Sequence, residues 1–195
     1  MSLSIFIPTS LLKSCSDVFS DIICTLANLS FQQGCFPSSF KQAMVTPLLK
    51  RPDLDPSLSA NYRPISNLNN FSKILEKLFL ARLQPHVTAC QNFNPLQSAY
   101  RPMHSTETAL LFTLDHIYRA ADQGLTSVLV ALDLSAAFDT IDHHTLASRL
   151  YTSFGIRGTV IDWISSYLSG REQCIAVGQA RSAFASISTG VPQGS

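Results

Sequence analysis

Glycine is missing from a long central part of the chain. No glycine occurs between Cys35 and Gln123, whereas eight of the ten prolines lie between Pro37 and Pro102. This composition is typical of stiff, extended connections, and it excludes a glycine-rich phosphate-binding loop from this region. The patterns Gly-x-Gly-x-x-Gly and Gly-x-x-x-x-Gly-Lys occur nowhere in the chain. Neither a dinucleotide-binding fold nor a P-loop is therefore predicted.

Long apolar runs and paired cysteines are missing as well. Apolar stretches such as residues 127–134 fall well short of the ~20 residues of a membrane-spanning helix, so no such helix is predicted. The first eight residues place no basic residue before their apolar patch, which argues against a secretory signal. The five cysteines form no Cys-x-x-Cys pair. We expect reduced core thiols in an intracellular protein of the nucleus or cytoplasm.

Hydrophobic residues are abundant, and charge is distributed unevenly. Of 195 residues, 46% are hydrophobic and 14% charged, which predicts a folded globular protein rather than a disordered tail. The net charge is +1, but residues 41–101 carry +5 and residues 102–195 carry −3. A basic middle and an acidic end fit a protein that holds polyphosphate in one part and metal cations in another. Solvated faces without a function explain the same charges equally well.

Hydrophobic periodicity in the first half predicts helices around one strand. A helix is expected from Thr9 to about Gly34, with one apolar face formed by Leu11, Cys15, Val18, Ile22 and Leu26. A strand is expected at 43–49, followed by a proline-bounded loop at 52–63. A second helix is expected at 70–83, with Pro85 kinking or ending it.

The second half alternates helices with strands. Ser105 is the expected cap of a helix that ends near Gly124, and residues 127–132 form an expected strand, buried on both faces, that ends at Asp133. Helices are expected at 142–154 and 159–168, and a hairpin around Gly178. The predicted fold class is α/β.

Asp133 is the most informative single position. A carboxylate directly after a buried strand lies at the rigid edge of a sheet, where it can hold a metal ion; an ordinary strand-end turn is the alternative. The surrounding residues from Ala131 to His143 read ALDLSAAFDTIDH. This string resembles the first palm motif of reverse transcriptases, most closely those of non-LTR (LINE-type) retrotransposons.

Four further segments resemble motifs of the same family, in the family's order. The finger motifs are matched by AMVTPLLK at 43–50, by NYRPIS at 61–66 with KILE at 73–76, and by QSAYRP at 97–102 with Ser105 and Thr106. The next palm motif is matched by GVPQGS at 190–195. Together the segments span about three quarters of the chain, so the resemblance does not depend on one string.

The resemblance implies an α/β (α+β) right-hand polymerase architecture. It divides the chain into an N-terminal helical lead-in at 1–36, fingers at 37–126 and a partial palm with an incomplete antiparallel sheet at 127–195. The activity it implies is RNA-directed DNA synthesis, in which two metal ions assist the transfer of deoxynucleotides to a primer 3′-hydroxyl. The implied partners are an RNA template, a DNA primer and deoxynucleoside triphosphates, with no membrane. Self-association is expected through the exposed edge of the palm sheet.

The resemblance also assigns roles in the palm. Asp133 would bind both Mg²⁺ ions, with the backbone carbonyl of Leu134 as a second oxygen ligand. Phe138 would lie under the sugar and favour deoxynucleotides, although without the motif it would be interpreted as a core aromatic. Gln193 would contact the incoming nucleotide, and Gly194 would let the backbone approach the template and primer.

Basic residues of the fingers receive the remaining roles. Lys50 and Arg63 fall where the family contacts the triphosphate, and Arg51 and Arg101 are expected to contact nucleic acid. A solvated pair at a strand end is the alternative for Lys50 and Arg51. We assign structural roles to four charged or histidine residues at the end of the first palm motif and directly after it, Asp139, Asp142, His143 and His144, with Asp142 as a helix cap. Core packing is favoured over base stacking for Tyr62, Phe93 and Tyr100.

The family's Tyr-Ala-Asp-Asp motif does not occur in these 195 residues. In the family Asp133 shares the two metal ions with the carboxylates of that later motif, and by itself it cannot hold both. The isolated chain is therefore expected to be inactive, and whether it is an enzyme stays open. A noncatalytic nucleic-acid-binding or interaction protein is an alternative, and so is a decayed retroelement remnant. RNA-dependent RNA synthesis is the nearest chemical alternative, and Phe138 argues against it.

Overall fold

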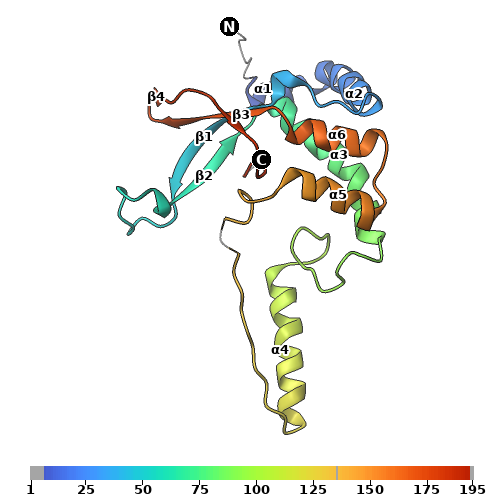
Figure 1. Cartoon of the computed structure of the whole chain (residues 1–195), viewed down its shortest axis with the longest axis vertical. Coiled ribbons are helices and arrows are strands. Elements are labelled where there is room, and N and C mark those ends of the chain that lie inside the picture. Colours follow the sequence, from blue (N-terminus) through green and yellow to red (C-terminus); the bar gives the residue numbers. More distant parts are fainter. Residues whose placement is uncertain (1–6, 135, 194–195) are drawn as a thin grey trace. The chain divides into compact units, whose positions relative to one another are not determined.

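The computed structural model describes residues 7–134 and 136–193 of the chain (Figure 1). The chain forms two compact units. The first consists of Met1–Leu83 and Ala136–Ser195, and the second of Gln84–Ser135. These units are defined by contacts and do not follow the expected division into lead-in, fingers and palm, which stays a prediction. The expected mixture of helices and strands is confirmed.

A mixed sheet lies in the first unit. Its strands are β1 (Gln42–Leu49), β2 (Tyr62–Asn67), β3 (Arg171–Val177), β4 (Ala180–Arg181) and β5 (Ala185–Ile187). β1 is central: it pairs antiparallel with β2 and parallel with β3, whose other edge pairs antiparallel with β4 and β5. The hairpin expected around Gly178 is therefore present, whereas β2 takes the place of part of the expected loop at 52–63.

Helices surround an aromatic core in this unit. They are α1 (Thr9–Ser14), α2 (Ser16–Gln32), α3 (Asn70–Ala89), α5 (His143–Phe154) and α6 (Thr159–Leu168), with 3₁₀ turns at Ser38–Phe40 and Ser59–Asn61. Figure 1 shows α2 and α6 beside the N-terminal part of α3. Trp163 of α6 is 3% exposed and stacks on Phe79 of α3 at 3.9 Å between ring centroids. Because aromatic rings bury large apolar areas, this stack is a major source of stability.

The N-terminal helix differs from its prediction. The chain breaks at Cys15, where φ is −115° and ψ is 32°, so α1 and α2 are separate helices. The break shifts the helical phase between the two, and Leu11, Val18 and Ile22 of the expected buried face are exposed. The buried residues are instead Leu12 of α1 and Ala27 and Ser30 of α2.

The second unit contains the C-terminal end of α3 and helix α4 (Thr106–Asp122). α3 continues through Pro85, so of the two expected effects, a kink or an end of the helix, the end does not occur. Proline removes one backbone hydrogen bond, a loss that a 20-residue helix tolerates here. Ser105 caps α4 as predicted, because its hydroxyl accepts from the Thr108 amide and its own amide donates to the Thr108 hydroxyl.

Residues 127–132 are not a strand in the structure, contrary to the prediction. They belong to an irregular segment, and its apolar side chains are exposed, with Leu132 90% exposed. A strand requires a neighbour to complete its hydrogen bonds, and no segment within 7–134 or 136–193 pairs with these residues. A short apolar run with two valines alone therefore does not produce the expected palm strand.

Two further expectations concern membranes and cysteines. Among the helices in the described part of the chain, none combines the length and the apolar character that crossing a bilayer requires. Cys174 is buried, as expected of a core thiol. Cys24 and Cys35 are exposed, so the expectation that all five thiols lie in the core is wrong. Cys24 lies on the outer side of the amphipathic helix α2, whereas Cys35 follows this helix in a segment without helical structure.

Candidate functional site

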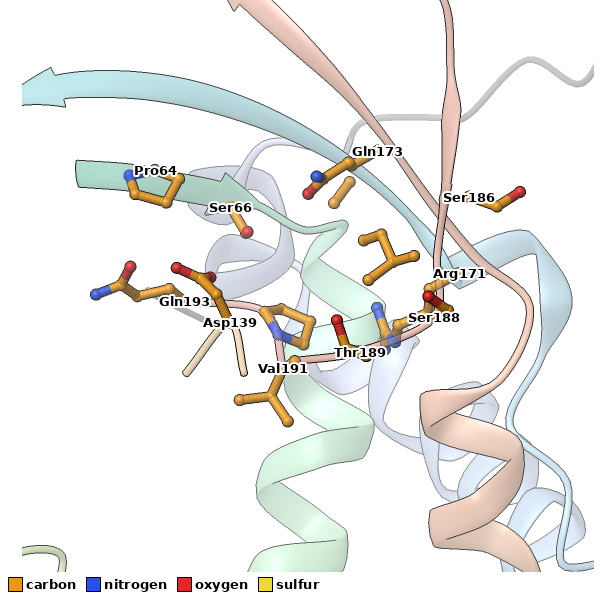
Figure 2. A pocket seen from close by; sticks show the side chains of 14 residues that line it. Pro64, Ser66, Asp139, Arg171, Gln173, Ser186, Ser188, Thr189, Val191 and Gln193 are labelled. Atoms are coloured by element: carbon orange, nitrogen blue, oxygen red, sulfur yellow. The ribbon is translucent and has the colours of Figure 1, made fainter. Parts of the chain in front are cut away.

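A pocket of about 400 Å³ opens on the first unit, where the sheet meets the loop before the C-terminus (Figure 2). The sheet contributes residues from β1, β2, β3 and β5, and the loop contributes Ser188 to Gln193. Most lining side chains are polar, and many of them carry hydroxyl groups. Figure 2 shows Ser66 of β2, Asp139 and Gln193 at one end of the pocket. The matched palm segment at 190–193 therefore forms one wall of a cavity.

This loop is fastened to the first palm motif by backbone hydrogen bonds. The Gly190 amide donates to Ile141 O and the Val191 amide donates to Phe138 O, both at 2.8 Å. Asp142 and Thr189 form an isolated antiparallel β-bridge beside them. Two motifs that lie about fifty residues apart in the sequence thus form one backbone junction.

Gly190 is required at this junction by space and by conformation. Its φ is +80°, and a Cβ added here would lie 2.8 Å from Phe138 O and 2.9 Å from both Asp139 Cα and Asp139 O. Contacts this short with backbone atoms cannot be relieved by a side-chain rotation. The glycine thus permits the two palm motifs to approach each other as closely as they do.

His143 adds a side-chain bond to the same junction. Its Nε2 lies 2.7 Å from Gly190 O, and because a carbonyl oxygen only accepts, Nε2 donates and carries the proton. Asp142 caps α5, with Oδ1 accepting from the Thr145 amide at 2.7 Å, as predicted. Interactions with the Thr145 side chain and with its backbone amide lower the pKa of the Asp142 carboxyl below its usual value. Both side chains therefore organise the motif.

A further bond ties β2, which carries a segment matched to a finger motif, to the loop. The Ser66 amide donates to Gln193 O at 2.8 Å, and Ser66 is buried. Gln193 is thereby held by its backbone, which leaves its side chain at the pocket (Figure 2). The finger and palm segments of the resemblance are in direct contact here.

Phe138 lies in a tight turn rather than in the core. The turn is closed by the Asp139 amide, which donates to Ala136 O at 2.9 Å, and the Phe138 ring is 38% exposed. Its carbonyl is the acceptor for Val191. The interpretation of Phe138 as an ordinary core aromatic therefore does not apply to this structure.

The basic residues of the fingers lie on and after β1 and on β2. Lys50 follows β1, and its Nζ donates to Ala60 O at 2.8 Å, which braces the loop between the two strands. Arg51 is exposed and lies 3.6 Å from Asp53, a distance too long for strong pairing at the surface. Arg63 is exposed on β2. Since side chains alternate along a strand, Arg63 lies on the face opposite Pro64 and Ser66, away from the pocket.

Three predicted site residues, Asp133, Leu134 and Arg101, lie in the second unit. Asp133 and Leu134 end the exposed irregular segment, so the expected support by a buried strand is wrong. Arg101 Nη1 donates to Pro95 O at 2.7 Å, and its guanidinium lies over the Phe93 ring. Tyr100 is 80% exposed, which contradicts the expected core role. Gly194 lies outside the described residues.

The described residues do not complete a metal site. Within 7–134 and 136–193, no cluster of three or more histidine, cysteine, aspartate or glutamate side chains could hold a metal ion. The resemblance places one carboxylate, Asp133, and one carbonyl, Leu134, at the metal. These oxygens suit Mg²⁺ by their chemistry, but two ions need more ligands than this pair supplies.

Two pocket residues were not predicted as functional. Asp139 lines the pocket although its sequence context indicates only a structural role. Arg171, the first residue of β3, also lines it and is 2% exposed. Burial lowers the pKa of the Arg171 guanidinium, against the opposing effects of Tyr167 and Glu76. A single arginine after a helix carries no sequence signal that would distinguish it from a surface residue.

The family model and the similar proteins both point to RNA-directed DNA polymerases. The family model described as "Reverse transcriptase (RNA-dependent DNA polymerase)" matches residues 49–195. The chain is 30% identical over 160 residues to "Probable RNA-directed DNA polymerase from transposon BS" of Drosophila melanogaster, covering 82% of this chain and 17% of that protein.

Two other relatives are polymerases or polyproteins of mobile elements. The "RNA-directed DNA polymerase from mobile element jockey" of Drosophila melanogaster is 28% identical over 162 residues, or 83% of this chain and 17% of the relative. The "Retrovirus-related Pol polyprotein from type-1 retrotransposable element R2" of Popillia japonica is 28% identical over 151 residues, or 77% and 20%. The chain thus spans about a fifth or less of these relatives. The extent of the family match shows that this chain belongs to the reverse transcriptase family.

Proposed function

We propose that the chain forms the fingers and first palm motifs of an RNA-directed DNA polymerase of a LINE-type retrotransposon. The observation that carries this proposal is the junction at the pocket. There, a finger strand, the first-motif turn and the loop at 189–193 are fastened together by the amides of Ser66, Gly190 and Val191. An arrangement that fixes three motifs around one cavity suits the positioning of a nucleotide.

Within this proposal each matched residue has a defined role. Gln193 contacts the incoming deoxynucleotide, and the exposed Phe138 ring beside the loop excludes a ribose 2′-hydroxyl. Asp133 and the Leu134 carbonyl ligate Mg²⁺, which would stabilise the charge that develops on the transferred phosphate. Gly194 allows the template and primer to approach.

Basic residues are proposed to contact the triphosphate of the nucleotide and the template and primer strands. Lys50 and Arg63 are assigned to the triphosphate by the resemblance, and because Arg63 faces away from the pocket, its contact would lie outside the cavity. Arg51 and Arg101 are assigned to an RNA template paired with a DNA primer. The enzyme would act inside the cell, in the nucleus or cytoplasm. The exposed apolar segment at 127–134 supports the proposal that the chain associates with itself.

The proposal is tested in a hybrid enzyme. The matched 160 residues replace their counterpart in the transposon BS polymerase, and extension of a primed RNA template with deoxynucleotides is measured. We expect extension by the hybrid, and a loss on the order of 10³-fold in Asp133→Asn because a metal ligand is removed. The 195 residues alone are expected to extend nothing, since they contain one of the required carboxylate motifs.

A matched control separates catalysis from folding. Asp122→Asn removes another carboxylate from the second unit, at the end of α4, and is expected to keep full activity. Equal activity of Asp133→Asn and the parent hybrid would refute the proposal. A hybrid that binds the primed template normally yet extends nothing would instead favour the noncatalytic binding role.

Salt dependence tests the basic residues of the fingers. Neutralising Lys50 and Arg63 together to glutamine is expected to lower the slope of log affinity against log salt for single-stranded RNA by about one to two units. The reason is that each phosphate contact releases roughly 0.7 counterion from a single strand. Fluorescence anisotropy with a labelled RNA, repeated at several salt concentrations, measures this slope.

The control changes the same charge elsewhere. Lys13→Gln with Arg149→Gln removes one lysine and one exposed arginine from α1 and α5, and the slope should stay at the parent value. If the two double variants behave alike, the basic finger residues are solvated charges and not a binding surface.

A further inference from the structure

Arg171 is a buried cation whose flat faces are covered by aromatic rings. Its guanidinium carbon lies 4.1 Å from the ring centroid of Tyr167 and 5.5 Å from that of Phe36. Its Nε donates to Tyr167 O at 2.6 Å. These contacts hold the guanidinium in place, but the rings cover only its two faces and the carbonyl bonds only Nε. The N–H groups of the two terminal nitrogens point outward in the plane of the group, so none of these contacts satisfies them.

The two terminal nitrogens of Arg171 have no hydrogen-bond partner among the described residues. Glu76 Oε1 lies 4.0 Å from Nη2, beyond hydrogen-bonding distance. The same oxygen already accepts from the Tyr167 hydroxyl at 2.9 Å and from the Ser72 hydroxyl at 3.3 Å. Glu76 therefore offsets part of the charge without satisfying the donors. Buried donors are rarely left without an acceptor, so this pair of nitrogens points to a group from outside the chain.

The pocket lies next to Arg171, but each terminal nitrogen exposes less than 1 Å², so an incoming group must displace neighbouring atoms to reach them. Arg171 lines it together with Ser186, Ser188 and Thr189, and Figure 2 shows the Arg171 side chain in the same part of the pocket as Ser188 and Thr189. Asp139, the one lining carboxylate, lies at the other end beside Gln193. An anion near Arg171 would therefore meet hydroxyl donors and a cation, whose charge Glu76 offsets in part from 4.0 Å, while Asp139 lies at the other end.

We propose that this end of the pocket is a phosphate-binding subsite. The terminal nitrogens of Arg171 would bind two phosphate oxygens as a planar fork, and the Ser188 hydroxyl would donate to a third. The phosphate belongs to a nucleotide or to the backbone of a nucleic acid, since both present the same oxygens. The subsite involves residues of the first unit only and does not rest on the polymerase activity proposed above.

The test observes the guanidinium directly. The 195-residue chain, labelled with ¹⁵N-arginine, is titrated with inorganic phosphate while the side-chain resonances are recorded by NMR, with Arg171→Lys to assign the signal. A saturable shift of the Arg171 signals, with the exposed Arg149 unaffected, is expected. A shift that does not saturate, or that Arg149 shares, would overturn the subsite, as would acetate acting as strongly as phosphate.

Variants identify the residues and the source of the phosphate. Arg171→Met should abolish saturable binding, and Ser188→Ala should weaken it about two- to tenfold through the loss of one hydrogen bond. Ser188 is exposed, so its variant keeps the test valid if Arg171→Met does not fold; unchanged affinity in Ser188→Ala would contradict the hydroxyl's role. The same titration is repeated with a deoxynucleoside triphosphate and with a short single-stranded RNA. The ligand that binds more tightly than inorganic phosphate shows whether the phosphate belongs to a nucleotide or to a nucleic-acid backbone. Failure of the hybrid polymerase leaves these shifts unchanged, so the two proposals fail independently.

Discussion

Replacing Gly190 with alanine is expected to lower the free energy of unfolding by about 2–5 kcal/mol. A left-handed conformation costs an alanine about 1–2 kcal/mol, and forcing a methyl group against packed atoms adds about 1–3 kcal/mol. The new Cβ would overlap Phe138 O and the Asp139 backbone. The midpoint of thermal unfolding, followed by circular dichroism, should fall by roughly 5–15 °C.

Gly178 provides the matched control for this change. Its φ of +59° imposes the same conformational strain, but an added Cβ would meet no atom within 4 Å. Gly178→Ala should therefore show the strain alone, about 1–2 kcal/mol. The close approach of the two palm motifs would be disproved by a Gly190→Ala variant no less stable than Gly178→Ala.

Replacing Trp163 with alanine is expected to cost about 3–5 kcal/mol, a typical loss for a buried large aromatic. The ring stacks on Phe79 and Tyr167 and meets Phe31 and Phe36 at their edges, so its removal leaves a cavity that four rigid rings cannot fill. Its Nε1 also donates to Ser30 Oγ at 2.8 Å. Urea unfolding followed by circular dichroism measures the change, because Trp163 is the only tryptophan and fluorescence is lost with it.

Two variants calibrate this result. Trp163→Phe keeps an aromatic ring but loses the donor to Ser30, and its cost should be intermediate. Phe184→Ala truncates an aromatic that is largely exposed and should change stability by less than about 0.5 kcal/mol. A Trp163→Ala variant as stable as Phe184→Ala would show that the aromatic cluster does not form the core.

Elements with local signals were predictable from the sequence. The helix at Thr159–Leu168 has its expected bounds, and Ser105 and Asp142 cap their helices because capping depends on residues only three positions away. The exposed side of α2 was not predictable in this way. Its phase depends on the break at Cys15, which lies among Ser14, Ser16 and Asp17 but is marked by no glycine or proline.

In the candidate site, too, residues with a local sequence signal were predictable and residues placed by long-range packing were not. The palm loop at 190–193 and Phe138 were identified by their motifs, and the structure places both at one junction. Arg171 and Asp139 were not identified, because a residue's position in a pocket results from packing between distant segments. The expected strand at 127–132 fails for the same reason, since strand formation requires a partner that local pattern does not reveal.

The parallel pairing of β1 with β3 has a consequence for how the protein is made. The Gln42 amide side chain donates a hydrogen bond to the Glu172 carboxylate, and Trp163 Nε1 donates one to the Ser30 hydroxyl. The first unit therefore joins residues about 130 positions apart in the sequence. Such non-local contacts slow folding, because a long loop must close before any contact compensates for its entropy. The ribosome synthesises about 5–20 residues per second, so β3 and α6 emerge on the order of ten seconds after β1 and α2, with which they pack. During that interval the nascent chain exposes an unpaired strand edge, and general chaperones that shield apolar segments should bind it there.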